Sequence, residues 1–207
     1  MKRPDTGFSL IELIIVMVVL VIISTIAIPA ILVTIRNYRL DAAGHAVASL
    51  LQQARLQAVK TNQSTYAQYD TTKSPNLVFV NSDPTVAYVN GDPDAELTAT
   101  VSFQPAGIPD HAQLDAYVGA GTVIEVGTPI GFNARGMPCM ADKANALRCL
   151  QTDPVVGGTP SFEWFVQSSG NQGWEAITVT AAGRIKTWRL SGLDATSTRC
   201  GYAACWN

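Results

Sequence analysis

The chain has 207 residues, of which 47% are hydrophobic and 14% are charged, and its formal net charge is −2. This length is enough for one globular domain and an additional apolar element. The slightly acidic balance argues against a generally basic protein that coats nucleic acid.

An apolar segment lies near the N-terminus. Between Phe8 and Ile28 the only polar side chains are those of Ser9, Glu12, Ser24 and Thr25. Twenty-one helical residues span about 30 Å, the thickness of the hydrocarbon core of a bilayer. Lys2 and Arg3 precede the segment. By the positive-inside rule they keep the N-terminus in the cytoplasm. The sequence therefore predicts a single-pass membrane protein whose N-terminus is cytoplasmic and whose C-terminal part lies on the opposite side of the membrane.

The residues around the start of this segment carry a recognisable motif. The run Gly7-Phe8-Ser9-Leu10-Ile11-Glu12 closely resembles the processing motif of type IV pilins and type II secretion pseudopilins. The resemblance implies that prepilin peptidase cuts between Gly7 and Phe8 and methylates the new amino group of Phe8. No small-residue cleavage site follows the apolar run, so we expect the helix to remain in the product and residues 1–7 to be a leader peptide.

Glu12 is the single charged side chain inside the apolar segment. A charged residue within a membrane helix costs about 2.5 to 3.5 kcal/mol on insertion scales and usually marks a function. From the residues alone, a carboxylate that reaches up to the lipid headgroups is an equally good interpretation. The resemblance favours subunit assembly, because in pilins the matching Glu pairs with the N-terminal amine of a neighbouring subunit.

The helical pattern continues beyond the membrane. Apolar residues, Ala42 among them, recur at three- and four-residue spacing from Ile31 to Ala58, with charged residues between them, which predicts helix to about Thr61. Pro29 removes one backbone hydrogen bond and predicts a kink or local unwinding. It is either a simple kink at the membrane exit or, as the resemblance to pilins suggests, a place where the helix loosens during assembly.

From Ser64 onward the pattern changes to short β-type runs separated by turn residues. The predicted strands are Thr65–Tyr69, Leu77–Val80, Ala87–Val89, Leu97–Phe103, Thr122–Val126, Ile130–Asn133, Phe162–Gln167, Glu175–Thr180 and Arg184–Leu190. The predicted fold class is α+β, a long N-terminal helix packed on a C-terminal antiparallel β domain. The predicted boundaries are leader 1–7, membrane helix 8–29, amphipathic helix 30–62 and periplasmic β-rich domain 63–207.

Three segments narrow the resemblance. The end of the helix, from Leu50 to Gln63, contains an Ala-Arg-x-x-Ala pattern at Ala54–Ala58 and resembles GspH/FimT-like minor pseudopilins and minor pilins. Residues Ile130–Gly136 and Ile177–Lys186 resemble strands of that family that end in a glycine turn. The resemblance implies the pilin fold. Residues from about Pro138 to Pro160 have no recognised counterpart.

The four cysteines are Cys139, Cys149, Cys200 and Cys205, all beyond the predicted membrane helix. An even number in a periplasmic domain fits disulfides. Four cysteines allow three connectivities, and we expect neighbours to pair. A four-cysteine zinc site is the competing interpretation, but the spacing within each pair is wider than zinc ligands usually show. No metal or other cofactor is therefore predicted.

Catalysis is not predicted either. The two histidines are His45 on the helix and His111 beside Asp110. No activated serine or cysteine motif accompanies them, and adjacent residues seldom face each other as a catalytic pair must. The acidic residues between Asp83 and Glu96 offer oxygen ligands for calcium, but their spacing matches no calcium-binding template, and such residues commonly form turns.

The C-terminal end is locally basic. From Gly183 to Asn207 there are four basic residues, Arg184, Lys186, Arg189 and Arg199, against the single acid Asp194. Some FimT-like minor pilins bind DNA through a Gly-Arg-x-Arg motif, which Gly183–Lys186 resembles with Lys in the last position. Lysine neutralises a phosphate but lacks the bidentate fork of arginine. Trp188, Tyr202 and Trp206 would either stack on bases or belong to the core. A solvated hairpin without any nucleic-acid role is the alternative.

The primary hypothesis is a structural subunit of a type IV pilus or of a type II secretion pseudopilus. Its expected partners are prepilin peptidase, other pilins or pseudopilins, and inner-membrane lipid. The alternative is a minor pilin that binds DNA through Arg184, Lys186 and Arg189 for uptake in natural transformation.

Overall fold

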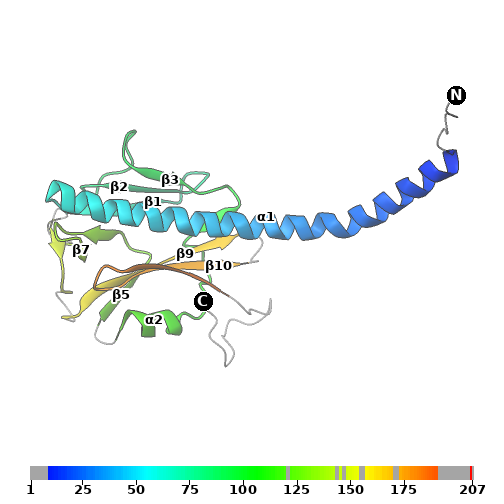
Figure 1. The fold of residues 1–207 in the computed structure, drawn as a ribbon. Coiled ribbons are helices and arrows are strands. Elements are labelled where there is room, and N and C mark those ends of the chain that lie inside the picture. Colours follow the sequence, from blue (N-terminus) through cyan, green and yellow to red (C-terminus); the bar gives the residue numbers. More distant parts are fainter. Residues whose placement is uncertain are drawn as a thin grey trace, which may run out of the picture. The chain divides into compact units, whose positions relative to one another are not determined.

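A computed structural model describes residues 9–119, 122–142, 145, 148–153, 157–169, 173–190 and 206 (Figure 1). The chain divides into two compact units, Met1–Tyr38 and Arg39–Asn207. Gly7, Phe8, Cys200 and Cys205, for which the sequence makes predictions, lie outside the described residues.

The long N-terminal helix is present. Helix α1 runs from Leu10 to Thr61 over 52 residues and ends where the sequence predicts. It continues as helix through Pro29. The unwinding considered for that position is therefore not seen, and a kink there stays a prediction.

The second unit contains the outer end of α1 and eleven described strands. Its first sheet has six strands in the order β3-β2-β1-β6-β7-β8. Its second sheet has the order β11-β10-β9-β4, and β5 also pairs with β9. The strand bounds are β1 Thr65–Asp70, β2 Leu77–Asn81, β3 Asp94–Glu96, β4 Val101–Phe103, β5 Thr122–Val126, β6 Ile130–Phe132, β7 Pro138–Ala141, β8 Cys149–Leu150, β9 Thr159–Ser168, β10 Trp174–Val179 and β11 Ile185–Arg189. The β5–β9 pair is parallel, and the other described pairs are antiparallel. The predicted α+β class is confirmed.

The main core lies between α1 and the sheets. The helix buries one face made of Leu40, Ala43, Gly44, Val47, Ala48, Leu50, Leu51, Ala54 and Ala58. Their spacing of three and four residues places them on one stripe. This stripe packs with residues of both sheets, among them Phe132 and Trp164. Ala42, which the sequence pattern includes in the apolar face, is exposed instead.

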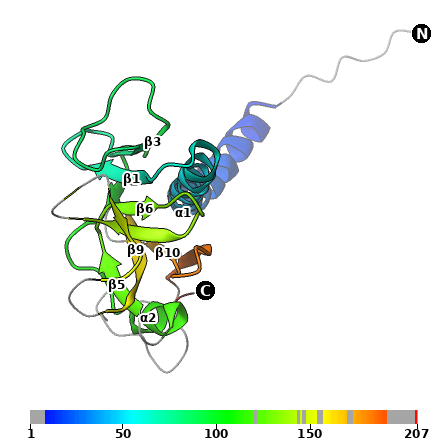
Figure 2. The same cartoon turned by 90° about the vertical axis from the view of Figure 1, so that its left-hand side faces the viewer.

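A smaller core lies on the other face of the second sheet. Helix α2, from Ala112 to Val118, covers this face (Figures 1 and 2). Leu114 of α2 packs there with Phe165 and Trp188. Strand β9 is buried on both faces, because successive side chains point alternately to α1 and to α2.

The structure corrects several predicted elements. Residues Ala87–Val89 form no strand, and of Leu97–Phe103 only Val101–Phe103 is a strand. The backbone N–H of Val101 donates to the carbonyl of Thr98 at 2.8 Å, so the preceding residues turn instead of extending. Helix α2 and strands β3, β7 and β8 were not predicted.

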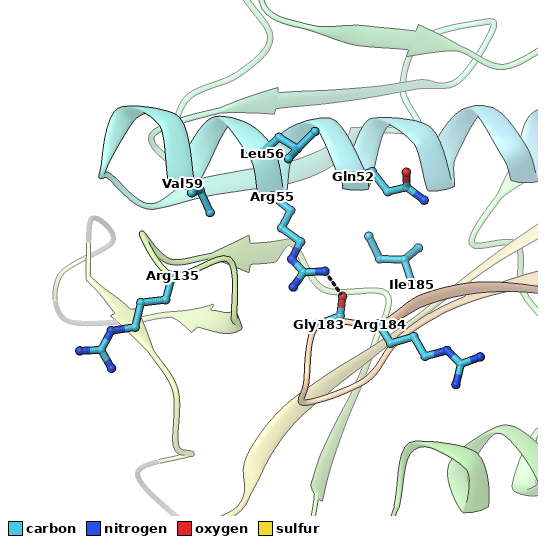
Figure 3. Close-up of a pocket in the computed structure, with 8 residues that line it drawn as sticks. All are labelled: Gln52, Arg55, Leu56, Val59, Arg135, Gly183, Arg184 and Ile185. Atoms are coloured by element: carbon cyan, nitrogen blue, oxygen red, sulfur yellow. Dashed lines mark hydrogen bonds between the residues drawn. The ribbon is translucent and has the colours of Figure 1, made fainter.

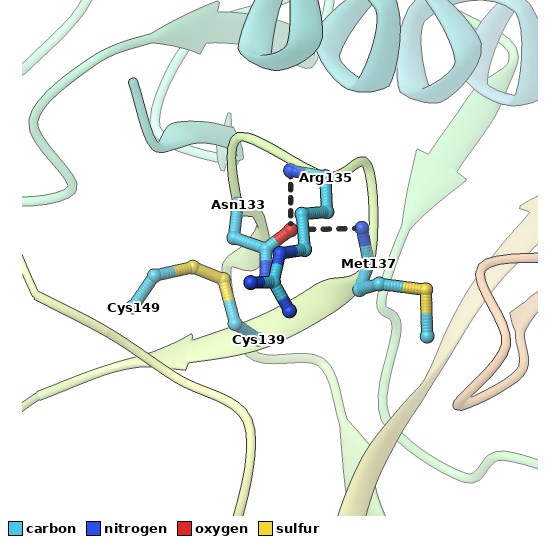
Figure 4. Close-up of a disulfide and its surroundings, with 5 residues drawn as sticks. All are labelled: Asn133, Arg135, Met137, Cys139 and Cys149. Carbon is cyan, nitrogen blue, oxygen red and sulfur yellow. Dashed lines mark hydrogen bonds between the residues drawn. A yellow bond between two sulfur atoms is a disulfide. The ribbon is translucent and has the colours of Figure 1, made fainter. Parts of the chain in front are cut away.

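A disulfide closes the segment between β7 and β8. Cys139 and Cys149 are bonded, with a Cα–Cα distance of 5.3 Å, and this member of the predicted neighbour pairing is confirmed (Figure 4). The turn that precedes β7 is held by Asn133, whose side-chain oxygen accepts from the backbone N–H groups of Arg135 and Met137 at 2.9 and 3.0 Å.

Candidate functional site

The first unit consists of a helix with an apolar surface. Helix α1 contains an 18-residue window of mean hydropathy 3.0 whose residues are not buried against the rest of the chain. Three hydroxyl side chains in this part of α1 form hydrogen bonds within the helix. The hydroxyls of Ser24, Thr25 and Thr34 donate to backbone carbonyls three or four residues earlier at 2.7 to 3.0 Å. The helix therefore presents almost no unsatisfied hydrogen-bonding group to an apolar surrounding.

Glu12 is the exception in this apolar surface. It lies in the first turn of α1, and its side chain is exposed. Among the residues that the structure describes, no hydrogen bond or ion pair involves its carboxylate. A partner that neutralises Glu12 is therefore not found among the described residues and would come from another part of the chain or from another molecule.

Three separately predicted motifs meet in the second unit around Arg55. The glycine turns at Gly136 and Gly183 both have positive φ, 72° and 78°. The guanidinium of Arg55 donates to the carbonyl of Gly183 at 2.9 Å (Figure 3). A Cβ atom at Gly136 would lie 3.1 Å from Arg55 Nε, and one at Gly183 would lie 3.0 Å from the Gly136 carbonyl oxygen. The two alanines of the Ala-Arg-x-x-Ala pattern, Ala54 and Ala58, are buried in the core. They hold this part of α1 against the sheets, and Arg55 between them reaches the two glycine turns.

A basic pocket of about 490 Å³ opens at this junction. Its lining includes Arg55 from α1, Arg135 from the turn before β7 and Arg184 from the turn before β11, and no acidic residue. Arg135 and Arg184 are exposed, and Figure 3 shows their guanidinium groups pointing outward on either side of Arg55. Three cations without a lining carboxylate suit an anionic ligand.

The three predicted DNA contacts do not form one surface. Lys186 lies over the ring of Trp188 at 3.3 Å from the centroid, and Arg184 lies 5.9 Å from the ring centroid of Tyr117. Arg189 is instead bonded to both carboxylate oxygens of Asp41 in α1, at 2.7 and 2.9 Å. Since Lys186 and Arg189 are separated by an odd number of positions in β11, they point to opposite faces, and the charge of Arg189 is already paired.

The aromatic residues considered for base stacking are core residues where the structure describes them. Trp188 and Trp206 are buried, 7% and 1% exposed, and both belong to the cluster beside α2. Tyr202 lies outside the described residues. Stacking of bases on these two tryptophans is therefore excluded without rearrangement of the core.

The acidic residues between Asp83 and Glu96 do not gather into a metal site. Within the described residues, a single group of three or more potential ligands comes together, and it consists of His111, Asp115 and Glu163. The carboxylate of Asp83 accepts instead from the backbone N–H and the hydroxyl of Thr85, as a turn residue does. His45 is exposed on α1.

Two glutamates, Glu163 and Glu175, are buried in the fold, and the sequence analysis did not predict their burial. Glu175 in β10 is 4% exposed and Glu163 in β9 is fully buried. Burial and, to a lesser extent, the charge of Asp41 raise the pKa of Glu175 to about 8, although Arg189 acts in the opposite direction. Burial also raises the pKa of Glu163 to about 8, with a smaller contribution from Asp115. The sequence signal was a lone acid within each continuous apolar strand, Phe-Glu-Trp-Phe and Trp-Glu-Ala-Ile.

Comparison with solved structures finds two similar chains of low sequence identity. One is the type IV minor pilin FimU of Pseudomonas aeruginosa, with 13% identity, a TM-score of 0.44, and coverage of 72% of this chain and 88% of that one. The other is the minor pseudopilin EpsH from the type 2 secretion system of Vibrio cholerae, with 8% identity, a TM-score of 0.41, and coverage of 72% and 95%. No curated protein matches the chain significantly.

The N-terminal segment matches a known family. Residues 2–28 match the prokaryotic N-terminal methylation motif. This stretch contains Gly7, Phe8 and Glu12, the residues on which the sequence analysis placed processing and assembly, and most of the exposed apolar segment. In this N-terminal segment the chain is therefore similar to proteins that carry the prokaryotic N-terminal methylation motif.

Proposed function

We propose that this chain is a minor pilin or minor pseudopilin, made as a precursor and assembled into a type IV pilus or a type II secretion pseudopilus. The observation that carries the proposal is the methylation motif at residues 2–28, followed by an apolar helix whose residues are not buried by their own chain. Such a helix needs an apolar surrounding from outside. A bilayer supplies it before assembly, and the packed helices of other subunits supply it afterwards.

Processing creates the partner for Glu12. Cleavage between Gly7 and Phe8 releases an amino group one helical turn from Glu12 along the chain, and its methylation keeps it basic. The amine of one subunit neutralises the carboxylate of its neighbour, which removes the cost of placing either charge in a low-dielectric surrounding. This explains why a carboxylate is present where the remainder of the segment, up to Ile35, carries no charge.

The second unit provides the part of the subunit outside the membrane. Its Cys139–Cys149 disulfide suits an oxidising compartment. Lys2 and Arg3 on the other side of the apolar segment place the N-terminus in the cytoplasm. The proposed location is therefore the inner membrane, with residues 63–207 in the periplasm. The proposed parts before it are the leader 1–7, the membrane helix 8–29 and its continuation 30–62.

Mass spectrometry of the intact protein extracted from membranes tests the processing step. The expected mature chain begins at Phe8 and carries one methyl group on its amine. A Gly7→Val variant, which places a branched side chain at the cleavage site, should keep residues 1–7 and lack the methyl group. A wild-type chain that starts at any other residue, or at an unmodified Phe8, contradicts the proposal.

DNA binding is a second candidate function, which the acid-free pocket lined by Arg55, Arg135 and Arg184 favours. Phosphate groups are the anions that such a site would meet in DNA, and binding through so few cations should weaken steeply with salt. The experiment is titration of the full chain in detergent with fluorescent double-stranded DNA at low and moderate salt.

The variants discriminate between specific and general attraction. Arg135→Gln combined with Arg184→Gln, both in the lining of the pocket, should reduce the affinity for DNA, whereas Lys73→Gln, which removes an exposed lysine elsewhere, should leave it nearly unchanged. Equal affinity of the double variant and the wild type, or no binding by either, would sink the DNA candidate and leave the filament proposal intact.

A further inference from the structure

A group of three potential metal ligands lies between α2 and the second sheet. His111 immediately precedes α2, and its backbone carbonyl accepts from the N–H groups of Leu114 and Asp115 at 2.8 and 3.1 Å. This turn places His111 and Asp115, four residues apart, on one side of the helix. Glu163 extends from β9 on the face that α2 covers. One ligand atom from each of the three residues lies within 4.8 Å of the other two.

The environment of Glu163 is an independent indication that this group binds a ligand. Its side chain is fully buried, and among the residues that the structure describes neither of its carboxylate oxygens has a hydrogen-bond partner. Buried acids are normally paired, hydrogen-bonded or bound to a metal. Within the described part of the chain no ion pair reaches Glu163 or Asp115, and the neighbouring charge is the like charge of Asp115.

The hydrogen bonding of the His111 imidazole leaves one ring nitrogen able to bind a cation. Its Nδ1 lies 3.1 Å from the carbonyl oxygen of Pro109. Because a carbonyl only accepts, Nδ1 carries the hydrogen, and in the neutral ring Nε2 keeps a free lone pair. Donation from the second ring nitrogen to a backbone carbonyl is the usual way in which a metal-binding histidine is oriented. Contact with Phe165, at 5.5 Å between ring centroids, further fixes the ring.

The scaffold around the group is held at both ends of α2. Gln113 donates to the carbonyl of Trp206 at 2.9 Å and accepts from its backbone N–H at 3.0 Å. The indole N–H of Trp206 donates to the carbonyl of Asp110 at 3.0 Å. Leu114 and Val118 are buried. The three ligands therefore lie on elements whose separation is fixed by packing, as a metal site requires.

We propose that His111, Asp115 and Glu163 bind a divalent transition-metal cation, Zn²⁺ by the chemistry of the donors, through one imidazole nitrogen and two carboxylate oxygens. Mixed nitrogen and carboxylate ligands are typical of Zn²⁺, whereas Ca²⁺ and Mg²⁺ take oxygen ligands alone. Zinc bonds of about 2.1 Å place neighbouring ligand atoms about 3.4 Å apart, so a small contraction of the group suffices. Three protein ligands leave the fourth position to water. The cation would tie α2 to β9 and neutralise the two carboxylates.

Zinc titration of the full chain in detergent tests the proposal. The protein is prepared without a histidine tag, stripped with a chelator, and titrated with Zn²⁺ in competition with a fluorescent zinc indicator. The wild type should bind one Zn²⁺ per chain. His111→Gln and Glu163→Gln should each weaken binding at least about tenfold. His45→Gln, which changes the other histidine of the sequence, is the matched control and should bind as the wild type does.

Thermal unfolding gives a second measure. Zinc should raise the Tm of the wild type and of His45→Gln by several degrees and leave the Tm of Glu163→Gln unchanged. Glu163→Gln keeps the shape of the side chain and places an uncharged group in the same buried position, so it should fold. If it does not, Asp115→Asn, at a partly exposed position, gives the same comparison. Absence of saturable binding by the wild type, or undiminished binding by the ligand variants, overturns the proposal; the second result would place the zinc elsewhere on the chain.

Discussion

Glu175 offers a quantitative test of the electrostatics beneath α1. Its carboxyl group lies so close to the helix that a Cβ atom at Gly44 would be 2.2 Å from one of its oxygens. Arg189 lies opposite it in β11, but its guanidinium is bonded to Asp41. One cation thus faces two carboxyl groups, and burial together with Asp41 keeps the pKa of Glu175 at about 8 instead of the ordinary 4.5.

The sign of the pH dependence follows from this raised pKa. Between about pH 4.5 and pH 8 the folded chain binds more protons at Glu175 than the unfolded chain does, so its contribution to stability falls as the pH rises. The contribution is complete below pH 4.5 and is lost as the pH passes through 8. At 1.36 kcal/mol per pKa unit the upper limit is about 5 kcal/mol. Relaxation and water penetration reduce the cost of buried charges, so we expect about 2 to 3 kcal/mol.

The assay is thermal unfolding of the full chain in detergent, followed by tryptophan fluorescence, at about pH 5 and about pH 8.5. Glu175→Gln should match the wild type at the lower pH and exceed its Tm at the higher pH by about 5 to 10 °C. Glu96→Gln removes an exposed glutamate and should follow the wild type throughout. The raised pKa of Glu163 affects all three proteins equally. If Glu175→Gln keeps the full pH dependence of the wild type, the electrostatic reasoning is wrong.

Two further predictions concern the turns and the disulfide of the second unit. Gly183→Ala should lower stability by about 1 to 3 kcal/mol, because it combines positive φ with a carbonyl 3.0 Å from the new Cβ atom. Gly107 has a similar φ, 80°, with open space around it, so Gly107→Ala should lower the stability less. Equal losses of Tm in the two variants would show that crowding at the junction is unimportant. Replacing Cys139 and Cys149 together by serine should cost about 3 kcal/mol for a loop with a sequence separation of 10, measured as Tm without reductant. A double variant as stable as the oxidised wild type would refute that estimate.

The N-terminal half of the architecture was predictable because its signals are local. An uninterrupted apolar run specifies a long exposed helix, and the change of pattern after Thr61 marks where the helix ends. The motif at Gly7–Glu12 was recognisable from six residues, and the match of residues 2–28 to the methylation motif confirms it. The glycine turns at Gly136 and Gly183 were likewise visible as turn residues after apolar strands.

The functional details of the second unit were less predictable because they depend on contacts between distant residues. Arg55 and Gly183 are 128 positions apart, and no local pattern shows that the guanidinium bonds to that turn. The pairing of Arg189 with Asp41 spans 148 positions, so counting charges near the C-terminus overestimated the basic surface. Helix α2 was missed because its seven residues are too few for a helical period to stand out.

The position of the buried acids was equally hidden. In β9 both faces are buried, so the apolar run around Glu163 gave no alternation from which its environment could be predicted. Its proximity to His111 exists only because α2 packs across β9. Asp110 is the neighbour of His111 in the sequence, but the carboxylates that gather with His111 in the fold are those of Asp115 and Glu163.

The most direct test of the central claim is the recovery of the chain in filaments purified from cells that express Glu12→Gln. This variant should be cleaved and methylated like the wild type but remain in the membrane fraction, because the amine of the adjoining subunit no longer has a carboxylate to pair with. Ser9→Ala, a neutral change in the same part of the segment, should enter filaments normally. Incorporation of Glu12→Gln at the level of the wild type would contradict the claim that this carboxylate directs assembly.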